Sequence, residues 1–230
     1  DYNYIYINNL IGTAEKPIVF IADGKVNIGV DNSYSMILGN SKFVKIIGVN
    51  YNIIFGAPFG KPYSKQAFGF HGSDELEVTG CELRFSEVGF FSNPTTGSYK
   101  NINLHHNWIH DLDNPSDAGR SEAFYIGSTS LSTRKNGGAF ESVNITDNLL
   151  ENLAGDGIQV ALTNNLKILR NRIIGYGKAN LNWQRTSIIV GGVTSNVLVQ
   201  GNYIQGGTGS PFQFFGTGTA WFDNNTAIDC

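Results

Sequence analysis

The chain has 230 residues, with 16 lysines and arginines against 19 aspartates and glutamates, which gives a formal net charge of −3. This balance gives no electrostatic case for binding nucleic acid or an anionic membrane surface. No apolar run approaches the ~18 residues that a membrane span needs. The 2 cysteines exclude a disulfide scaffold, and the 28 glycines with an apolar set rich in Ile, Val, Phe and Tyr favour β structure.

The chain opens at Asp1 without a methionine, and we expect it to be a processed or excised segment of a longer protein. Abundant Asn, Gly, Thr and aromatic residues with few lysines are typical of secreted bacterial proteins. An extracellular or cell-surface location is therefore expected. Residues 1–230 are predicted to form one domain.

Seven short runs along the chain alternate between apolar and variable positions. Their second and fourth residues are apolar or glycine, and the first and third vary. The runs are SMIL (35–38), AFGF (67–70), VGFF (88–91), AFYI (123–126), GIQV (157–160), SIIV (187–190) and PFQF (211–214). This alternation predicts strands with one buried face. In the run at 88–91, the frame places Gly89 and Phe91 inside and Phe90 outside.

Five asparagines each close a second kind of alternating run. They are Asn107, Asn148, Asn171, Asn202 and Asn225, separated by 41, 23, 31 and 23 residues. A basic period of 23 with insertions indicates a coiled repeat. Asparagine tolerates the backbone of a tight bend, and stacked amides can hydrogen-bond along the coil axis, so we predict a structural role. An earlier repeat holds Cys81 at this position, and we expect it to face inward as a small apolar residue.

A third, shorter run follows each asparagine. Its second residue is Ile109, Leu150, Ile173 or Ile204, and Leu83 takes the same position one repeat earlier. Each repeat thus contains three short strands, and equivalent strands of successive repeats would stack ~4.8 Å apart. Because a repeat buries its interior only by stacking on the next, we predict an all-β coil of about seven rungs and three parallel sheets.

These three strand sets and the asparagine column resemble the right-handed parallel β-helices of the pectate lyase-like superfamily, many of which carry an asparagine ladder at the bend between the second and third sheets. The resemblance runs from about KPIVFIADGKVNI (16–28) to the end of the chain. It implies a single-stranded right-handed parallel β-helix. In that superfamily the substrate usually lies along the first sheet between loops that enter it, which here are residues 110–122 and 175–186. The resemblance therefore implies a polysaccharide partner.

An acid precedes the first-sheet run in three successive repeats, namely Glu87, Glu122 and Asp156. Neighbouring acids would lie about one rung apart and the outer two roughly 9–10 Å apart, which brackets the carboxyl separations of retaining and inverting glycosidases. Stacked like charges raise one carboxyl pKa, which suits a general acid. We predict Glu122 and Asp156 as acid and base or nucleophile, with Glu87 as a third carboxylate or metal ligand.

Two alternatives stay open for these acids. The same cluster could bind Ca²⁺ through hard oxygen ligands. Acids before strands also often accept hydrogen bonds from turn N–H groups, and by strand parity the three could face the interior.

Residues that could bind a sugar lie on the outward positions of the first sheet and in its entering loops. They are Phe90, Tyr125 and Gln159 on the strands and Trp183, Arg120 and Arg185 in the loops. Aromatic faces stack on sugar rings, and amides hydrogen-bond to their hydroxyls. The two guanidinium groups could hold a uronate or a sulfate, or could pair with acids of the first loop.

Some expected motifs do not support a site. The histidines of HHNWIH (105–110) have metal-like spacing, but the predicted strands separate them, so we predict no histidine metal site. The chain contains no Asp-Asp pair and no Gly-His-Gly, so polygalacturonase chemistry in its usual form is unsupported.

The sequence thus predicts a secreted or cell-surface protein that binds and cleaves polysaccharide along its first sheet, by hydrolysis or by elimination. A non-catalytic adhesin or carbohydrate-binding stalk is the alternative, because no complete catalytic motif is present. A filament-forming subunit is a third possibility. Neither end shows an obvious cap, so a further domain or end-to-end stacking is expected there.

Overall fold

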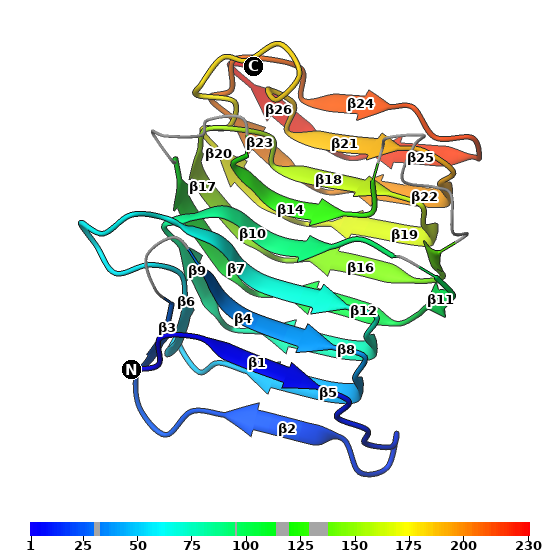
Figure 1. The fold of residues 1–230 in the computed structure, drawn as a ribbon. Coiled ribbons are helices and arrows are strands. Elements are labelled where there is room, and N and C mark those ends of the chain that lie inside the picture. The colour runs from blue at the N-terminus through cyan, green and yellow to red at the C-terminus, as the bar shows by residue number, and fades with distance from the viewer. Residues whose placement is uncertain (30–32, 95, 114–119, 129–137) are drawn as a thin grey trace.

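The computed structural model describes residues 1–29, 33–94, 96–113, 120–128 and 138–230. Across these residues the chain forms strands and no helix, and so no helix that could cross a membrane. The strands wind into a coil whose rungs stack from the N-terminal end to the C-terminal end (Figure 1). Three sheets, each of eight parallel strands, form the coil. This confirms the parallel β-helix, with one more rung than expected because residues 5–28 add a turn before the first predicted run.

The strand order in each sheet follows the chain, so every strand pairs with its counterparts one rung away. The first sheet contains β1 (Ile5–Asn8), β4 (Tyr34–Gly39), β7 (Ser64–His71), β10 (Ser86–Ser92), β14 (Glu122–Ile126), β18 (Ile158–Ala161), β21 (Ile188–Gly191) and β24 (Phe212–Phe214). The second contains β2 (Ile18–Ile21), β5 (Lys42–Ile47), β8 (Asp74–Thr79), β12 (Ile102–His105), β16 (Val143–Thr146), β19 (Asn164–Leu169), β22 (Ser195–Gln200) and β25 (Ala220–Asp223).

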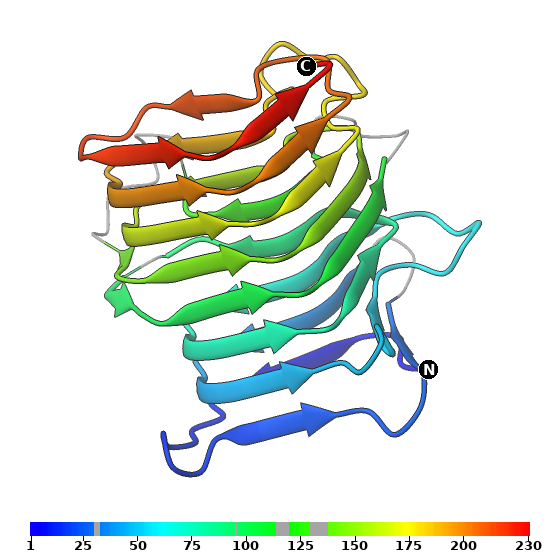
Figure 2. The same ribbon diagram turned by 180° about the vertical axis from the view of Figure 1, so that it is seen from behind.

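The third sheet closes each rung and is best seen from behind (Figure 2). It contains β3 (Val26–Ile28), β6 (Ile53–Phe55), β9 (Glu82–Arg84), β13 (Trp108–Leu112), β17 (Leu149–Leu153), β20 (Arg172–Ile174), β23 (Tyr203–Gln205) and β26 (Thr226–Ile228). A separate two-stranded sheet pairs β11 (Ser98–Tyr99) with β15 (Ala139–Phe140).

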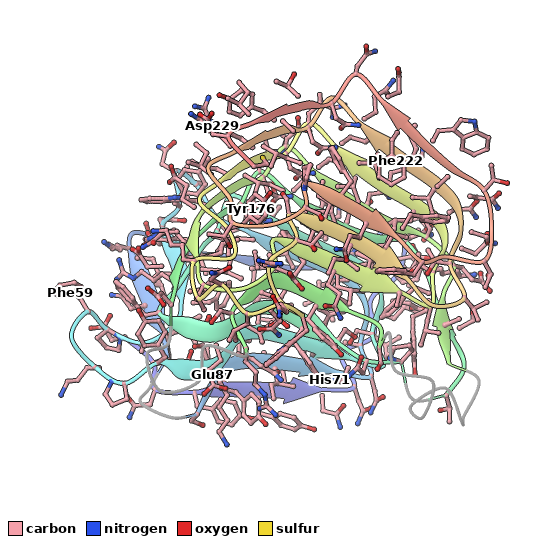
Figure 3. The ribbon with its side chains drawn as sticks, turned by 90° about the horizontal axis from the view of Figure 1, so that it is seen from above. Phe59, His71, Glu87, Tyr176, Phe222 and Asp229 are labelled. Atoms are coloured by element: carbon pink, nitrogen blue, oxygen red, sulfur yellow. The ribbon has the colours of Figure 1, made fainter. Side chains whose placement is uncertain are left out.

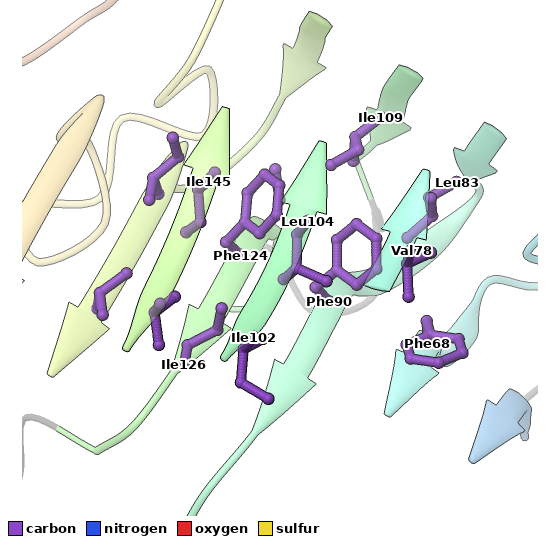
Figure 4. Close-up of a cluster of buried hydrophobic side chains, with 14 of the residues drawn as sticks. Phe68, Val78, Leu83, Phe90, Ile102, Leu104, Ile109, Phe124, Ile126 and Ile145 are labelled. Carbon is purple, nitrogen blue, oxygen red and sulfur yellow. The ribbon is translucent and has the colours of Figure 1, made fainter. Parts of the chain in front are cut away.

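The core runs along the inside of the coil as columns of like residues (Figure 4). Phe68, Phe90 and Phe124 follow one another on three successive rungs of the first sheet. Phe68 meets Phe90 edge-on with 5.8 Å between ring centroids, and Phe90 stacks on Phe124 at 5.1 Å. Aliphatic residues of the other two sheets, such as Leu104 and Ile109, are buried with them. Stacked burial of this kind requires all rungs to keep the same register.

The register of β10 corrects the prediction for Phe90. Phe90 pairs with Phe68 and Phe124 and is fully buried, whereas Phe91 pairs with Tyr125 and is half-buried on the outer face. The expectation that Phe90 faces outward was wrong, because Phe90 faces the core and the next residue, Phe91, faces outward. Alternation does not distinguish two adjacent phenylalanines, but only Phe90 continues the internal phenylalanine column.

The corner where the chain enters the first sheet interrupts the alternation. Ala123 belongs to the core together with Phe124, although the two are consecutive. One rung later, a Cβ on Gly157 would lie 3.4 Å from the Cγ2 of the core residue Ile173. The small residues Ala123 and Gly157 thus face the core together with the residue that follows each of them. Glu122 in β14 precedes Ala123 and is thereby turned toward the outer surface.

The asparagine ladder is present at the bend between the second and third sheets, and its members are buried except for the half-buried Asn225. Each Nδ2 donates to the Oδ1 of the next asparagine, at 3.2 Å for Asn107–Asn148, 3.0 Å for Asn148–Asn171, 3.0 Å for Asn171–Asn202 and 2.9 Å for Asn202–Asn225. The backbone N–H of Cys81 donates to Asn107 Oδ1 at 3.0 Å and so continues the ladder. Burial raises the pKa of the Cys81 thiol to about 12, so this cysteine is unreactive at neutral pH.

We expect removal of one ladder amide to destabilise the coil. In Asn171→Ala, the backbone N–H and Nδ2 of Asn148 both lose their buried acceptor, and the free energy of unfolding should fall by ~1–3 kcal/mol. Asn182→Ala, at an exposed loop position, should change it by less than ~0.5 kcal/mol. Urea denaturation measures both, and equal losses for the two variants would contradict a structural role of the ladder.

The corrected register predicts different costs for two adjacent phenylalanines. Phe90→Ala removes a fully buried ring from the core column and should lower the free energy of unfolding by ~3–5 kcal/mol. Phe91→Ala removes a ring from the outer face and should lower the free energy of unfolding by well under half as much. Thermal and urea unfolding of both variants test this, and a greater loss for Phe91→Ala would overturn the register.

Candidate active site

A cavity of about 370 Å³ opens on the outer face of the first sheet, where β4, β7, β10 and β14 begin. Its lining combines two cations, two phenols, three amides and one carboxylic acid with two apolar side chains. These residues are Tyr34, Lys65, Gln66, Val88, Phe91, Asn93, Arg120, Glu122, Tyr125 and Gln184. Four rungs and the loop before β21 thus supply a mixed polar and aromatic surface.

Glu122 is the acid of this cavity, and it is held in an environment that favours the protonated form. Only 2% of its surface is exposed, and Gln184 Nε2 donates to its Oε1 at 2.7 Å. Its Oε2 has no hydrogen-bond partner among the described residues. Burial raises the pKa of the Glu122 carboxyl to about 8, and the neighbouring Asp156 adds to the shift. At neutral pH this group can therefore donate a proton.

Asp156 lies one rung further along the coil but does not line the cavity. It is fully buried, and its Oδ1 accepts a hydrogen bond from the backbone N–H of Thr186 at 2.6 Å. Burial raises its pKa to about 7. The contact to Thr186 is the capping arrangement that the sequence left open as an alternative to catalysis.

Glu87 is displaced from the column of acids that the sequence suggested. Val88, one residue later, pairs with Glu122 in the sheet. The Glu87 carboxylate lies 4.0 Å from Arg120 Nη1, and it does not line the cavity. Arg120 does line it, with a largely exposed side chain. Glu87 therefore lies next to the cavity and contacts one of its lining residues, Arg120.

Two stacked rings form an aromatic platform beside Glu122. Phe91 and Tyr125 lie 5.5 Å apart with an interplanar angle of 18°, and both line the cavity. The platform thus contains the predicted Tyr125, with Phe91 in the place expected for Phe90. Gln159 pairs with Tyr125 in register, but only 7% of its surface is exposed, so little of its amide can be reached from outside.

The other two loop residues do not join this cavity. Trp183 is 71% exposed and lines no part of it. Arg185 donates to Asn180 Oδ1 at 3.1 Å and lines a different cavity of about 410 Å³, together with Gln213. Residues 114–119 of the first entering loop lie outside the described residues.

The described residues offer no metal centre. No three His, Cys, Asp or Glu side chains among them are grouped to hold an ion. Calcium takes six to eight oxygen ligands, whereas the cavity lining brings one carboxyl, protonated near neutrality, together with two cations. His105 and His106 contact each other at the bend after β12, whereas His110 lies in β13 beside Glu82 and Asp111.

Sequence reasoning missed Tyr34, Lys65, Gln66, Asn93 and Gln184 in the lining. Gln66 and Tyr34 occupy the same rung position as Glu122, so the alignment of repeats contained a signal for both. Nothing in the spacing identified Lys65 or Asn93. Gln184 lies far from Glu122 in sequence and reaches it only because its loop folds back over the first sheet.

No family model matches the chain, and no curated protein matches it. Among solved structures, an alginate lyase from Paenibacillus sp. str. FPU-7 is similar, with a TM-score of 0.62 and 13% sequence identity. The alignment covers 100% of this chain and 89% of that one. The comparison supports the predicted parallel β-helix fold.

The two buried acids predict a loss of stability at high pH. Their pKa values rise from 4.5 to about 8 in Glu122 and from 3.8 to about 7 in Asp156. The folded chain therefore binds more protons than the unfolded one between these values. The stability that these two carboxyl groups contribute is fully present below their pKa values in the unfolded chain. It is lost as pH rises through their pKa values in the folded chain, by up to ~1.4 kcal/mol per pH unit for each group.

Glu122→Gln should flatten this pH dependence, because the amide keeps an oxygen for the Gln184 hydrogen bond and has no proton to lose in this range. Urea unfolding at a series of pH values from mildly acidic to mildly alkaline measures the slope. Glu15→Gln, which changes an exposed acid, should keep the wild-type slope. A wild-type slope in Glu122→Gln would contradict a raised pKa for Glu122.

Proposed function

We propose that this protein is a polysaccharide lyase that cleaves a uronate-containing glycan by β-elimination in the cavity of the first sheet. One observation carries the proposal. Among the described residues that line the cavity, Glu122 is the single carboxylic acid, and it lies with two cations, Lys65 and Arg120. Negative substrate charge suits this lining, and the cavity's own acid is protonated near neutrality.

The same observation favours elimination over hydrolysis. Glycoside hydrolysis generally uses two carboxyl groups that flank the scissile bond. Asp156 is buried away from the cavity, and Glu87 does not line it. Elimination instead requires a cation or hydrogen-bond donor at the uronate carboxylate, a base for the proton beside that carboxylate, and an acid for the leaving oxygen.

The lining residues fit these tasks. Lys65 and Arg120 can pair with the uronate carboxylate, which makes the adjacent C–H more acidic. Phe91 and Tyr125 offer a stacked aromatic surface for the sugar rings. Glu122, protonated at neutral pH, can donate its proton to the glycosidic oxygen as the bond breaks.

Support of a different kind comes from the structural comparison. The alginate lyase with the same fold is a lyase of a polysaccharide. The proposal carries with it an extracellular or cell-surface location, because a long polysaccharide does not enter the cytoplasm intact.

The test is cleavage of a panel of uronate polymers, including alginate and polygalacturonate, with a neutral glucan as control. Elimination produces an unsaturated uronate, which absorbs ultraviolet light, together with a new reducing end. Glu122→Gln should lower kcat by a factor of ~10²–10⁴, the usual contribution of a general acid. Lys65→Ala and Arg120→Ala should raise KM, and Lys167→Ala, on the outer face of the second sheet, should behave as the wild type.

Three results would contradict the proposal. New reducing ends without the ultraviolet signal would indicate a hydrolase. Binding of a glycan without cleavage would indicate a carbohydrate-binding module. Unchanged kinetics in Glu122→Gln would remove Glu122 from the reaction.

A further inference from the structure

A second cavity lies on the first-sheet side of the coil, beyond the candidate active site. It has a volume of about 410 Å³ and is lined by the loop before β21, by the loop before β24 and by β24 itself. Its polar lining comprises two amides, two hydroxyls and a guanidinium, from Asn182, Gln213, Thr208, Ser210 and Arg185. Among the described residues that line it, Arg185 is the one charged side chain. The cavity therefore suits an anionic ligand that also forms hydrogen bonds.

The two loops that form the walls of this cavity are fixed to each other. Tyr176 in the first loop is fully buried, and its hydroxyl donates to the backbone carbonyl of Gly209 in the second loop at 2.9 Å. The hydroxyl of Thr208 donates in return to the carbonyl of Gly177. Figure 3, which views the coil down its axis, shows Tyr176 inside the outline of the molecule. The walls are thus in place before a ligand binds.

Arg185 is confined between two glycines of these walls. A Cβ on Gly177 would lie 2.8 Å from the Cβ of Arg185, and one on Gly209 would lie 2.6 Å from its Cγ. Nη1 of Arg185 donates to Asn180 Oδ1 at 3.1 Å, and the guanidinium forms no ion pair within the described part of the chain. Because its stem is already confined, this arginine loses little conformational freedom when it binds a carboxylate.

The second cavity lies in line with the aromatic platform of the candidate active site. One row of paired residues on the first sheet runs through Tyr125, Gln159, Ile189 and Gln213. Three rung spacings separate Tyr125 from Gln213, which places them ~14 Å apart along the coil axis, about the length of three sugar residues. The two residues between them line neither cavity. One extended glycan can therefore occupy both cavities at once.

The loop before β21 separates the two cavities and contributes to both. Gln184 lines the candidate active site, whereas Asn182 and Arg185 line the second cavity. Trp183 lies between these positions in the chain, and 71% of its surface is exposed. A glycan that crosses this loop thus meets an indole on which a sugar ring can stack.

We propose that the second cavity is a distal subsite, in which Arg185 pairs with the carboxylate of a uronate about three residues from the sugar on the aromatic platform. This assignment rests on the proposed lyase function. Asn182 and Gln213 supply amide groups for the hydroxyls of that uronate. No bond is made or broken there, so the subsite adds binding free energy only to oligomers that reach it from the active site.

The first test is calorimetric binding of saturated oligouronates, from dimers to octamers of alginate and polygalacturonate, to the Glu122→Gln protein. Affinity should rise ~10-fold or more once an oligomer spans both cavities, because a charge-assisted contact is added. Adding Arg185→Ala should remove this rise. Adding Arg170→Ala, which removes an exposed guanidinium paired with Asp147, should keep it.

The second test is turnover of the same oligomers by the protein with Glu122 intact. Arg185→Ala should raise KM for the long oligomers ~10-fold, with kcat unchanged and with short oligomers cleaved as by the wild type. A disturbed loop would also displace Gln184 and change the cleavage of short oligomers. Gln213→Ala, a change in β24 outside this loop, should raise KM for the long oligomers alone, by a smaller factor.

The outcomes separate this subsite from the proposed function. Affinity that is independent of oligomer length, or a rise that persists in Arg185→Ala, overturns the subsite while the lyase function stands. A rise that depends on Arg185, in a protein that cleaves no uronate glycan, overturns the lyase function and supports the cavity as a glycan-binding site. No binding of any oligouronate overturns both.

Discussion

Register between neighbouring rungs is the constraint on which this structure depends. A single rung has no second layer to cover its apolar face, so it is stable only when the next rung lies on it in the same register. Two columns hold that register from different sides. The amides of Asn107 to Asn225 form hydrogen bonds along the bend, and the rings of Phe68, Phe90 and Phe124 contact one another inside the first sheet. A shift of one residue would break both columns at once.

The candidate site follows from a local departure from this regularity. At the corner before the first sheet, two consecutive residues face the core, and Glu122 is turned outward beneath the loop that carries Gln184. The acid thereby combines two properties that rarely occur together, namely near-complete burial and contact with a cavity. Burial keeps its proton near neutrality, and the cavity offers a place to deliver it.

On the first sheet, some polar residues support the scaffold, whereas others line the cavity and are available for chemistry. Asp156 accepts a hydrogen bond from the backbone of its own scaffold and lies away from the cavity, whereas Glu122 lines the cavity. Each of the two acids keeps one buried oxygen without a partner among the described residues. The cations and phenols around Glu122 lie on different rungs of the same face. A polymer lying along the coil axis would meet them in sequence, because the rung spacing of ~4.8 Å is close to the length of one sugar residue.

The fold could be predicted from the sequence, because the repeat of three alternating runs and the asparagine column are periodic properties of the chain. It also pointed to Glu122, Tyr125 and Arg120, since repeat alignment shows which residues share a face. The choice between Phe90 and Phe91 required the folded structure, because an alternating pattern does not show which of two adjacent rings enters the core. The contact between Gln184 and Glu122 was also not predictable from the sequence, because it depends on the path of a loop, which has no period.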